Sequence, residues 1–365
     1  MVDIRELARL SGVSAATVSR ALNDRAEVSS QTRARILELA AQLGYSPSQP
    51  ARTLVRKRSD TIGLIWDTGY DSDGRRHPFL QDLLVALKRP LSDAGYHLML
   101  LATAESDGSV DTYLRATRQH SLDGIVLMGV DERHPAVTAI IDAGVPSVAV
   151  DLPLRGHRST YVSSDNRTGA ASAVTHLHGL GRRRIALVTG PPSLMPASER
   201  LAGYRYQIAR LGLPYRQEYV IFGDFFLHSG YEATQRLLDL PEPPDAIFAA
   251  GDEMAIGAMH AISDAGLSVP GDIAVVGFDD IESAALVRPA LTTVAQNSHA
   301  LCASAVEVLM SIIDGDGRGG TEPAPRILPT ELVIRDSCGA GGAEPAGRSR
   351  RAGAGRAGAG RAGGR

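Results

Sequence analysis

Residues 4–23 read IRELARLSGVSAATVSRALN, and this stretch decides the fold at the start of the chain. Apolar residues recur with the period of an amphipathic helix over residues 4–10, Gly12 interrupts the pattern, and a second short apolar face follows over residues 15–22. The spacing predicts two short helices joined by a tight turn. Any amphipathic helical hairpin shows this spacing, so the stretch alone leaves the function open.

The second predicted helix has a small, polar outward face. Ser14 can cap this helix by accepting a hydrogen bond from the backbone N–H near Thr17, and the helix start would then present backbone donors to a phosphate. Such a face can lie flat in a DNA major groove, and its side chains are those of Ala15, Ala16, Thr17, Ser19 and Arg20.

Charge is divided unevenly along the chain. Residues 1–58, which end in a basic segment after a third helical pattern at 30–40, hold ten Lys and Arg against five Asp and Glu. Subtraction from the totals of 38 and 41 leaves 28 against 36 for residues 59–365. A basic head of net charge +5 on an acidic body of net charge −8 is typical of a phosphate-binding module attached to a second domain, although a solvated face can also carry such a run.

Beyond residue 60, short apolar runs of strand length alternate with amphipathic stretches of helix length. Strands are predicted at 61–66, 96–101, 124–128, 145–150, 184–189, 220–222, 246–250, 273–278, 292–296 and 326–335. Helices are predicted at 79–94, 109–119, 135–143, 166–179, 198–211, 229–238, 253–265 and 300–313. This alternation predicts an α/β fold of parallel strands with right-handed crossovers, and its two series indicate two similar lobes with a cleft between them.

Polar residues follow the predicted strands, at the edge where open parallel sheets bind ligands. They are Asp67, Asp151, Asp165, residues 190–200, Phe225, Asp252 and Asp279. Carboxylates accept paired hydrogen bonds, Arg200 can donate a fork, and Phe79 or Phe225 can cover an apolar sugar face, which suits a ligand rich in hydroxyls. Each aspartate alone could equally cap a helix, Asp252 above all, so the prediction rests on their joint placement.

Four ordered motifs in the first 55 residues resemble the headpiece of the LacI/GalR family of bacterial transcription regulators. They are L-A-x-x-x-G-V-S-x-x-T-V-S-R-x-L-N at 7–23, V-S-x-x-T-R at 28–33, L-G-Y-x-P at 43–47 and A-R-x-L at 51–54. The resemblance covers residues 2–336. It implies a helix-turn-helix headpiece followed by a two-lobed domain like that of periplasmic binding proteins.

On DNA, the resemblance implies a symmetric dimer that recognises the two half-sites of a near-palindrome. The implied DNA contacts are Ser14, Ala15, Ala16, Thr17, Ser19, Arg20, Asn23, Arg52, Leu54 and Val55. Arg20 is the candidate for a bidentate guanine contact, and Leu54 would wedge into the minor groove from a hinge helix over 51–56. Ala15 and Ala16 replace larger side chains of members with familiar operators, so the operator sequence does not transfer.

In the body, the family's segments recur as R-x-x-G-Y at 200–204, G-D-F at 223–225, D-x-M-A at 252–255, G-F-D-D at 277–280 and P-x-L-T-T-V at 289–294. The implied effector-binding residues are Phe79, Asp151, Asp165, Arg200, Phe225, Asp252, Asp279 and Gln296. The loop before Phe79 is longer than usual, which leaves its contacts open. Leu194 stands where purine-responsive members hold an arginine, so a carbohydrate effector is preferred over a nucleoside or purine.

These patterns predict a division into four segments. They are a helix-turn-helix domain at 1–46, a hinge at 47–59, an effector-binding and dimerisation domain at 60–336 and a disordered Gly/Ala/Arg tail at 337–365. The first lobe would comprise 60–164 and 296–325, and the second 165–292 and 326–336. The tail shows no leucine heptads, which favours a dimer over a coiled-coil tetramer.

Other classes of function have weaker support in the sequence. Neither a G-x-x-x-x-G-K-[ST] loop nor a G-x-S-x-G elbow occurs, and His176 and His178 would face different directions on a helix, so we expect no catalytic residues, cofactor or metal. Without a leader or an 18-residue apolar run, we expect a soluble, cytoplasmic protein with Cys302 and Cys338 reduced. A sugar-binding protein without gene control stays open as an alternative.

Overall fold

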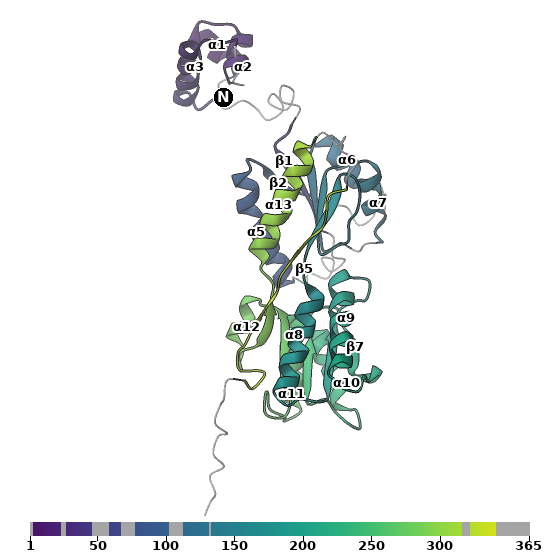
Figure 1. The fold of residues 1–365 in the computed structure, drawn as a ribbon. Helices are drawn as coiled ribbons and strands as arrows, with labels where there is room; N and C mark the ends of the chain where they lie inside the picture. The colour runs from purple at the N-terminus through teal and green to yellow at the C-terminus, as the bar shows by residue number, and fades with distance from the viewer. Residues whose placement is uncertain are drawn as a thin grey trace, which may run out of the picture.

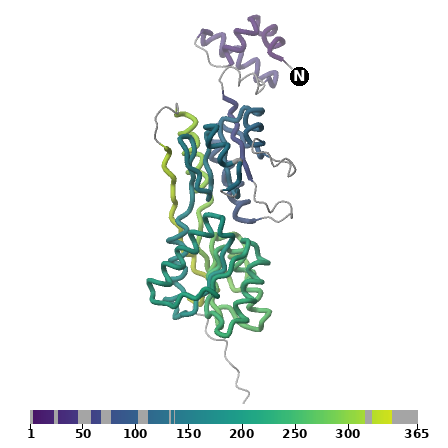
Figure 2. The backbone as a smooth tube through the Cα atoms, turned by 90° about the vertical axis from the view of Figure 1, so that its right-hand side faces the viewer, coloured from purple at the N-terminus to yellow at the C-terminus, as the bar shows by residue number. Residues whose placement is uncertain are grey.

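The computed structural model describes residues 3–22, 27–45, 58–66, 77–101, 112–130, 133–315 and 322–340. Within these ranges the chain forms a three-helix headpiece and two α/β lobes that follow one another along the long axis of Figures 1 and 2. The predicted class, a helix-turn-helix ahead of two mostly parallel sheets, is confirmed. No helix in the described part of the chain is long and apolar enough to span a bilayer.

The headpiece consists of α1 (Ile4–Ser11), α2 (Ala15–Leu22) and α3 (Ser30–Gln42). Asp3 caps α1 by accepting hydrogen bonds from two backbone N–H groups, and Gly12 ends the helix in the left-handed conformation that favours glycine. Leu7, Val18 and Ile36 place fully buried side chains in a small core shared by the three helices. The predicted helix-turn-helix is therefore present.

The first lobe is built around a parallel sheet with the strand order β11-β5-β4-β3-β1-β2. Its strands are β1 (Thr61–Trp66), β2 (His97–Leu101), β3 (Gly124–Met128), β4 (Ser147–Val150), β5 (Ser159–Ser164) and β11 (Arg326–Leu328). Helices α5 (Pro78–Asp93) and α13 (Ser298–Asp314) cover one face, and α6 (Thr112–Gln119) and α7 (Pro135–Asp142) cover the other. Val126 packs on the first face and Ile125 on the second, so β3 is apolar on both sides.

The second lobe repeats the plan with the strand order β12-β10-β9-β8-β6-β7, in which only β12 is antiparallel to its neighbour. Its strands are β6 (Ile185–Thr189), β7 (Val220–Phe222), β8 (Ala246–Ala249), β9 (Ala274–Asp279), β10 (Thr292–Ala295) and β12 (Glu331–Val333). The helix pair α8 (Asn166–Gly179) and α9 (Met195–Arg210) and the pair α10 (Leu227–Leu238) and α11 (Asp252–Asp264) cover its two faces. A short 3₁₀ helix, η2 (Gln217–Tyr219), precedes β7, and α12 (Glu282–Leu286) follows β9.

Three segments of the chain cross between the lobes, as Figure 2 shows. They follow β5 at Asp165, β10 at Gln296 and β11 at Pro329. Two of them are joined, because the Asp165 N–H donates a hydrogen bond to the Leu328 carbonyl at 2.7 Å. The crossings form the hinge about which two lobes of this kind can move.

The predicted single strand at 326–335 is wrong, and with it the placement of 326–328 in the second lobe. Arg326 to Leu328 pair with β5 in the first lobe, and only Glu331 to Val333 join the second sheet. Pro329 lies at the break, since proline has no N–H to donate to a sheet. The alternating sequence indicates extended chain and cannot indicate which sheet it joins.

The structure differs from the sequence predictions at three further places. Strand β5 and helix α12 were not predicted, because β5 (STYVSS) is rich in Ser and Thr and α12 is short. The expected tail begins too early, since Ser337 is fully buried and its hydroxyl accepts from the Thr292 N–H and donates to the Val275 carbonyl. Residues 341–365, and with them the rest of the predicted tail, lie outside the described residues.

Candidate effector site and DNA-binding surface

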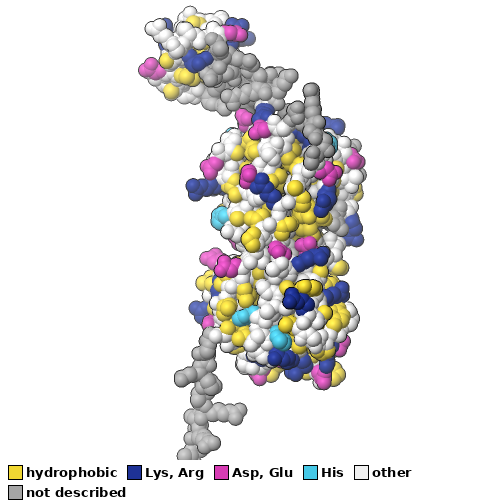
Figure 3. Space-filling view, viewed as in Figure 1, with side chains coloured by type: hydrophobic (Ala, Val, Ile, Leu, Met, Phe, Trp, Pro, Cys, Tyr) yellow, Lys and Arg dark blue, Asp and Glu magenta, His cyan; other side chains and the backbone are white. Residues whose placement is uncertain are grey.

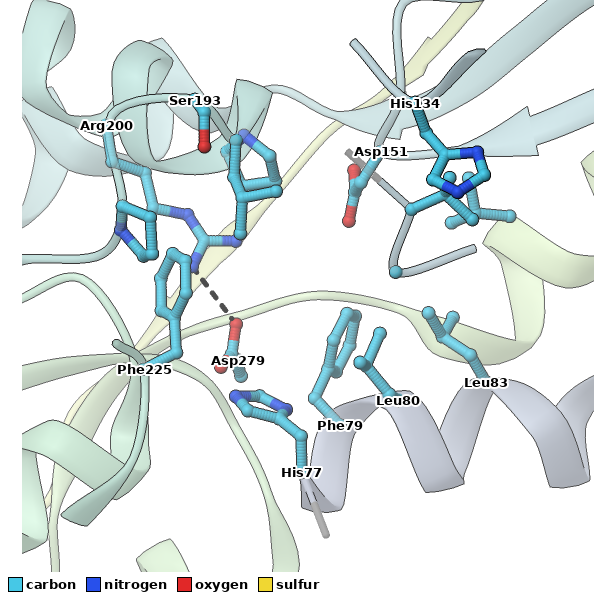
Figure 4. A pocket seen from close by; sticks show the side chains of 16 residues that line it. His77, Phe79, Leu80, Leu83, His134, Asp151, Ser193, Arg200, Phe225 and Asp279 are labelled. Carbon is cyan, nitrogen blue, oxygen red and sulfur yellow. Dashed lines mark hydrogen bonds and ion pairs between the residues drawn. The ribbon is translucent and has the colours of Figure 1, made fainter. Parts of the chain in front are cut away.

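A cavity of about 370 Å³ lies between the lobes, within the size range of small-molecule sites. The first lobe lines it with His77, Phe79, Leu80, Leu83, Gly129, Val130, His134, Val150 and Asp151. The second lobe lines it with Pro191, Ser193, Leu194, Pro196, Arg200, Phe225 and Asp279. Figure 4 shows the labelled side chains around the cavity, with Arg200 and Phe225 facing Leu80 and Leu83 of α5 across it.

Three non-glycine residues of this lining occupy the left-handed region of backbone space. The φ angles are 58° at Asp151 after β4, 70° at Phe225 after β7 and 114° at Asp279 at the end of β9. L-residues adopt such angles at a cost of roughly 1–3 kcal/mol, which the surrounding structure must offset. Strain at three strand ends that meet in one cavity indicates a binding site, as the carboxyl-edge argument predicted.

Arg200 is the cation of the cavity and is almost fully buried. Its Nε donates to Asn166 Oδ1 at 2.8 Å, and Nη1 donates to the Ala250 carbonyl at 2.6 Å and to Asp279 Oδ1 at 3.3 Å. The guanidinium lies 3.7 Å from the centre of the Phe278 ring, a cation–π contact. Burial lowers the pKa of Arg200, and its neighbouring carboxylates oppose this shift.

Asp279 faces Arg200 from the end of β9. Its Oδ1 also accepts a hydrogen bond from Gln296 Nε2 at 2.7 Å, so the residue at one interlobe crossing holds the carboxylate in place. Burial raises the pKa of Asp279 to about 6, although Arg200 and Gln296 favour the ionised form. Gln296 itself does not line the cavity and acts through Asp279.

Asp151 supplies the carboxylate of the first lobe. Its Oδ1 accepts a hydrogen bond from Ser163 Oγ at 2.6 Å, and burial raises its pKa while Ser163 and Arg200 lower it. The cavity thus receives one carboxylate from each lobe and one guanidinium. This set can accept several hydrogen bonds from a hydroxylated molecule and donate to it in return.

Phe225 and His77 meet where the lobes face each other. Their rings are edge-on with centroids 6.3 Å apart, and His77 also contacts Phe226 edge-on at 5.6 Å. Gly190 makes room for Phe225, because a Cβ there would lie 2.1 Å from a carbon of the ring. Burial, and next the charge of Arg200, lower the pKa of His77 to about 4.

Five of the eight predicted effector residues line the cavity: Phe79, Asp151, Arg200, Phe225 and Asp279. Asp165 instead caps α8 by accepting from the Thr168 N–H at 3.0 Å. Asp252 is fully buried beneath the site, where it accepts from the Ile281 N–H at 3.0 Å and from Thr293 Oγ1 at 2.6 Å. The helix cap raised as the alternative for strand-end aspartates is therefore confirmed for Asp165 and wrong for Asp252, which makes no cap hydrogen bond to α11.

Sequence reasoning missed several residues that line the cavity. Leu80 and Leu83 lie on α5 with the helical spacing expected of core residues, and His134 lies on the loop before α7. His77 precedes Phe79 by two residues, and its part in the site depends on the opposite lobe. No local signal marks these residues, because the cavity forms only when two lobes meet.

The candidate DNA-binding residues run along α2 from Ala15 to Arg20, and Ser14 immediately precedes the helix. Ser14 Oγ accepts from the Thr17 N–H at 3.1 Å, which confirms the predicted cap. Ala16 and Arg20 are exposed, and Arg20 Nε pairs with Glu27 Oε2 at 3.1 Å. Asn23, Arg52, Leu54 and Val55 lie outside the described residues, as does Asp67.

Cys302 and Cys338 are both buried and unbridged. Burial raises the pKa of Cys302 to about 12. Cys338 Sγ lies 3.2 Å from His176 Nε2, so this histidine of α8 packs against the chain that follows β12 in the second lobe. Among the described residues, no group of three or more His, Cys, Asp or Glu side chains could hold a metal ion.

Comparison with known proteins gives a consistent result. A family profile for bacterial regulatory proteins of the lacI family matches residues 3–48, and one for a periplasmic binding protein-like domain matches residues 174–338. The chain is 34% identical over 342 residues to the probable HTH-type transcriptional repressor ExuR of Bacillus subtilis, an alignment that covers 92% of this chain and 98% of ExuR.

Two solved structures extend the comparison. A complex of the transcriptional regulator CelR with cellobiose matches with a TM-score of 0.69 and 31% identity over 92% of this chain and 100% of that one. The lac repressor dimer bound to operator and the anti-inducer ONPF matches with a TM-score of 0.78 and 28% identity over 92% of this chain and 99% of that one.

Proposed function

The chain belongs to the LacI family of bacterial regulatory proteins, and we propose that it represses transcription as an operator-binding dimer that a carbohydrate effector releases. It is a regulator and not an enzyme, because its relatives are transcriptional regulators. A regulator that binds operator DNA works in the cytoplasm, so we place the protein there.

One observation carries this proposal. The chain combines a helix-turn-helix with a cavity that both lobes line. Asp151, Arg200 and Asp279 converge on this cavity. The site is rich in acceptors and holds a single guanidinium among its described residues, with Phe79 and Phe225 available to cover a sugar ring. These are the groups that recognise a polyol. CelR binds cellobiose within the same fold, which supports the assignment to carbohydrates.

The effector acts by changing the position of the two lobes relative to each other. Since both lobes contribute to one cavity, a ligand that contacts both stabilises one arrangement of them over others. The hinge segments at Asp165, Gln296 and Pro329 would carry this change toward the headpieces. Release of DNA then requires only that the effector binds the DNA-free arrangement better, by a coupling free energy of about 1–3 kcal/mol.

The dimer contact is proposed on the side of the molecule that carries α5 and α12. Val85 of α5, Leu100 of the edge strand β2 and Leu286 of α12 are 66%, 57% and 66% exposed. Charges on Asp82 of α5 and Glu282 of α12 influence each other, so the two helices are neighbours across the lobes. In Figure 3, hydrophobic side chains are interspersed with charged ones on the lobes. Apolar side chains exposed on one side suit a twofold interface.

Selection of DNA from a random pool by the full-length protein tests the proposal. We expect a near-palindrome of two half-sites. Arg20→Ala should cost roughly 1–3 kcal/mol of specific binding and relax one position per half-site. Glu27→Gln, which removes the exposed ion pair to Arg20 but no base contact, is the matched control and should keep full specificity.

Equal loss of affinity by Arg20→Ala on every sequence would place Arg20 on the phosphates instead. Selection of no half-site at all would contradict the proposed operator binding and favour a sugar-binding protein without gene control.

A further inference from the structure

One residue that lines the effector cavity carries a buried side-chain nitrogen with no hydrogen-bond partner. Among the described residues that line the cavity, His77 Nδ1 is the only buried side-chain nitrogen or oxygen without a hydrogen bond. A buried polar atom left unpaired costs about 1–3 kcal/mol. A ligand group that pairs with this atom would recover that cost on binding.

The chemistry of the ring defines the kind of group required. The pKa of His77 is lowered to about 4, so the imidazole is neutral at physiological pH and carries a single N–H. A hydrogen bond to the Phe225 backbone raises the pKa of His77, as expected of a ring N–H that donates to a carbonyl. Nδ1 has no partner, so Nε2 is the donating nitrogen and Nδ1 presents a lone pair.

The surroundings of Nδ1 narrow the ligand further. Figure 4 shows the imidazole beside Phe79 and Asp279, at the side of the cavity where the two lobes meet. The carboxylates of Asp151 and Asp279 are acceptors as well. A ligand in this site must therefore offer donors to several acceptors at once, which a sugar with adjacent hydroxyls does.

We propose that His77 is a specificity-determining residue of the effector site, whose Nδ1 accepts a hydrogen bond from an effector hydroxyl while the same ring holds Phe225 of the other lobe. This inference rests on the proposed function, since it assumes that the cavity takes a hydroxylated effector. His77 then links recognition to lobe position. A ligand bound at Nδ1 would contact the same ring that packs edge-on against Phe225 and Phe226.

Two variants distinguish the roles of the two ring nitrogens of His77. The amide of Asn reaches the position of Nδ1, whereas the amide of Gln reaches the position of Nε2. His77→Gln keeps a donor for the Phe225 backbone but has no acceptor at the Nδ1 position, so sugar affinity should fall five- to tenfold. His77→Asn keeps that acceptor and should bind within about twofold of the wild type, since a neutral hydrogen bond is worth roughly 1 kcal/mol.

Binding is measured by calorimetry on the full-length protein without DNA, with D-ribose, D-glucose and cellobiose as probes, and circular dichroism checks that each variant is folded. A purely structural role, in which the ring only holds Phe225, predicts the opposite order, with Asn weaker than Gln. That order, or equal affinities, would overturn the proposal. So would the failure of all three probes to bind the wild type.

Monodeoxy analogues of the tightest probe provide a second measurement. One missing hydroxyl should cost the wild type five- to tenfold and cost His77→Gln nothing further, because the partner is already absent. If every missing hydroxyl lowered the affinity of the wild type and of His77→Gln by the same factor, the assignment would be contradicted. Operator binding of the wild type is measured in parallel, so loss of the regulator function and loss of the His77 contact give different results.

Discussion

At the scale of single residues, Phe225 depends on Gly190 for its position in the site. A Cβ at residue 190 would lie 2.1 Å from one ring carbon of Phe225 and 2.3 Å from another. Gly190→Ala should therefore displace the ring and weaken effector binding about tenfold, or 1.4 kcal/mol. Titration calorimetry checks this. Gly179→Ala is the matched control, because a Cβ there meets nothing within 4 Å, and equal affinities for the two variants would contradict the packing argument.

Asp279 should make stability depend on pH. Its pKa is about 6 in the folded protein against an ordinary value of 3.8, because the carboxyl is buried. Between these values the folded state keeps a proton that the unfolded state has released, so the free energy of unfolding contributed by Asp279 falls as pH rises through this window. Asp279→Asn should remove that part of the slope, whatever its effect on absolute stability. Urea unfolding from pH 4 to pH 7 measures both slopes, and identical slopes would contradict the shifted pKa.

At the scale of elements, the cap of α2 serves both stability and DNA contact. Ser14→Ala should destabilise the headpiece by about 1 kcal/mol, because the Thr17 N–H loses its acceptor. Ser14→Asp keeps an acceptor there and should restore stability, but its charge would repel a DNA phosphate and abolish operator binding. Amide hydrogen exchange and anisotropy measure the two effects. Operator binding by Ser14→Asp at wild-type strength would show that this helix start does not face DNA.

Elements with a local signal could be predicted from the sequence, and those defined by a distant partner could not. α8 and β3 have the predicted ends, since capping by Asp165 and the apolar run at Gly124–Met128 are local. β11 and β12 share one extended sequence, and only pairing assigns them to different sheets. The same holds in the site. Arg200 and Asp279 lie in segments that the family motif identifies, whereas the role of His77 depends on Phe225 in the other lobe.

At the scale of the whole molecule, dimerisation brings two headpieces to one operator. Leu286→Asp should prevent association, because it places a charge in the proposed apolar contact, and should lower operator affinity by at least tenfold. Leu267→Asp is the control, since Leu267 is 38% exposed and lies outside that surface. Sedimentation equilibrium measures the mass of each variant. A dimeric Leu286→Asp variant would remove α12 from the interface.

The most direct measurement of the central claim is the anisotropy of labelled operator, selected as above, during titration with the protein and then with sugars. Salt is held fixed, because phosphate contacts make the affinity steeply salt-dependent. We expect tight binding that one neutral sugar reverses in the wild type and no longer reverses in Asp279→Ala, whose operator affinity is unchanged. Release by a nucleoside alone would contradict the carbohydrate assignment, and binding that no ligand changes would contradict effector control itself.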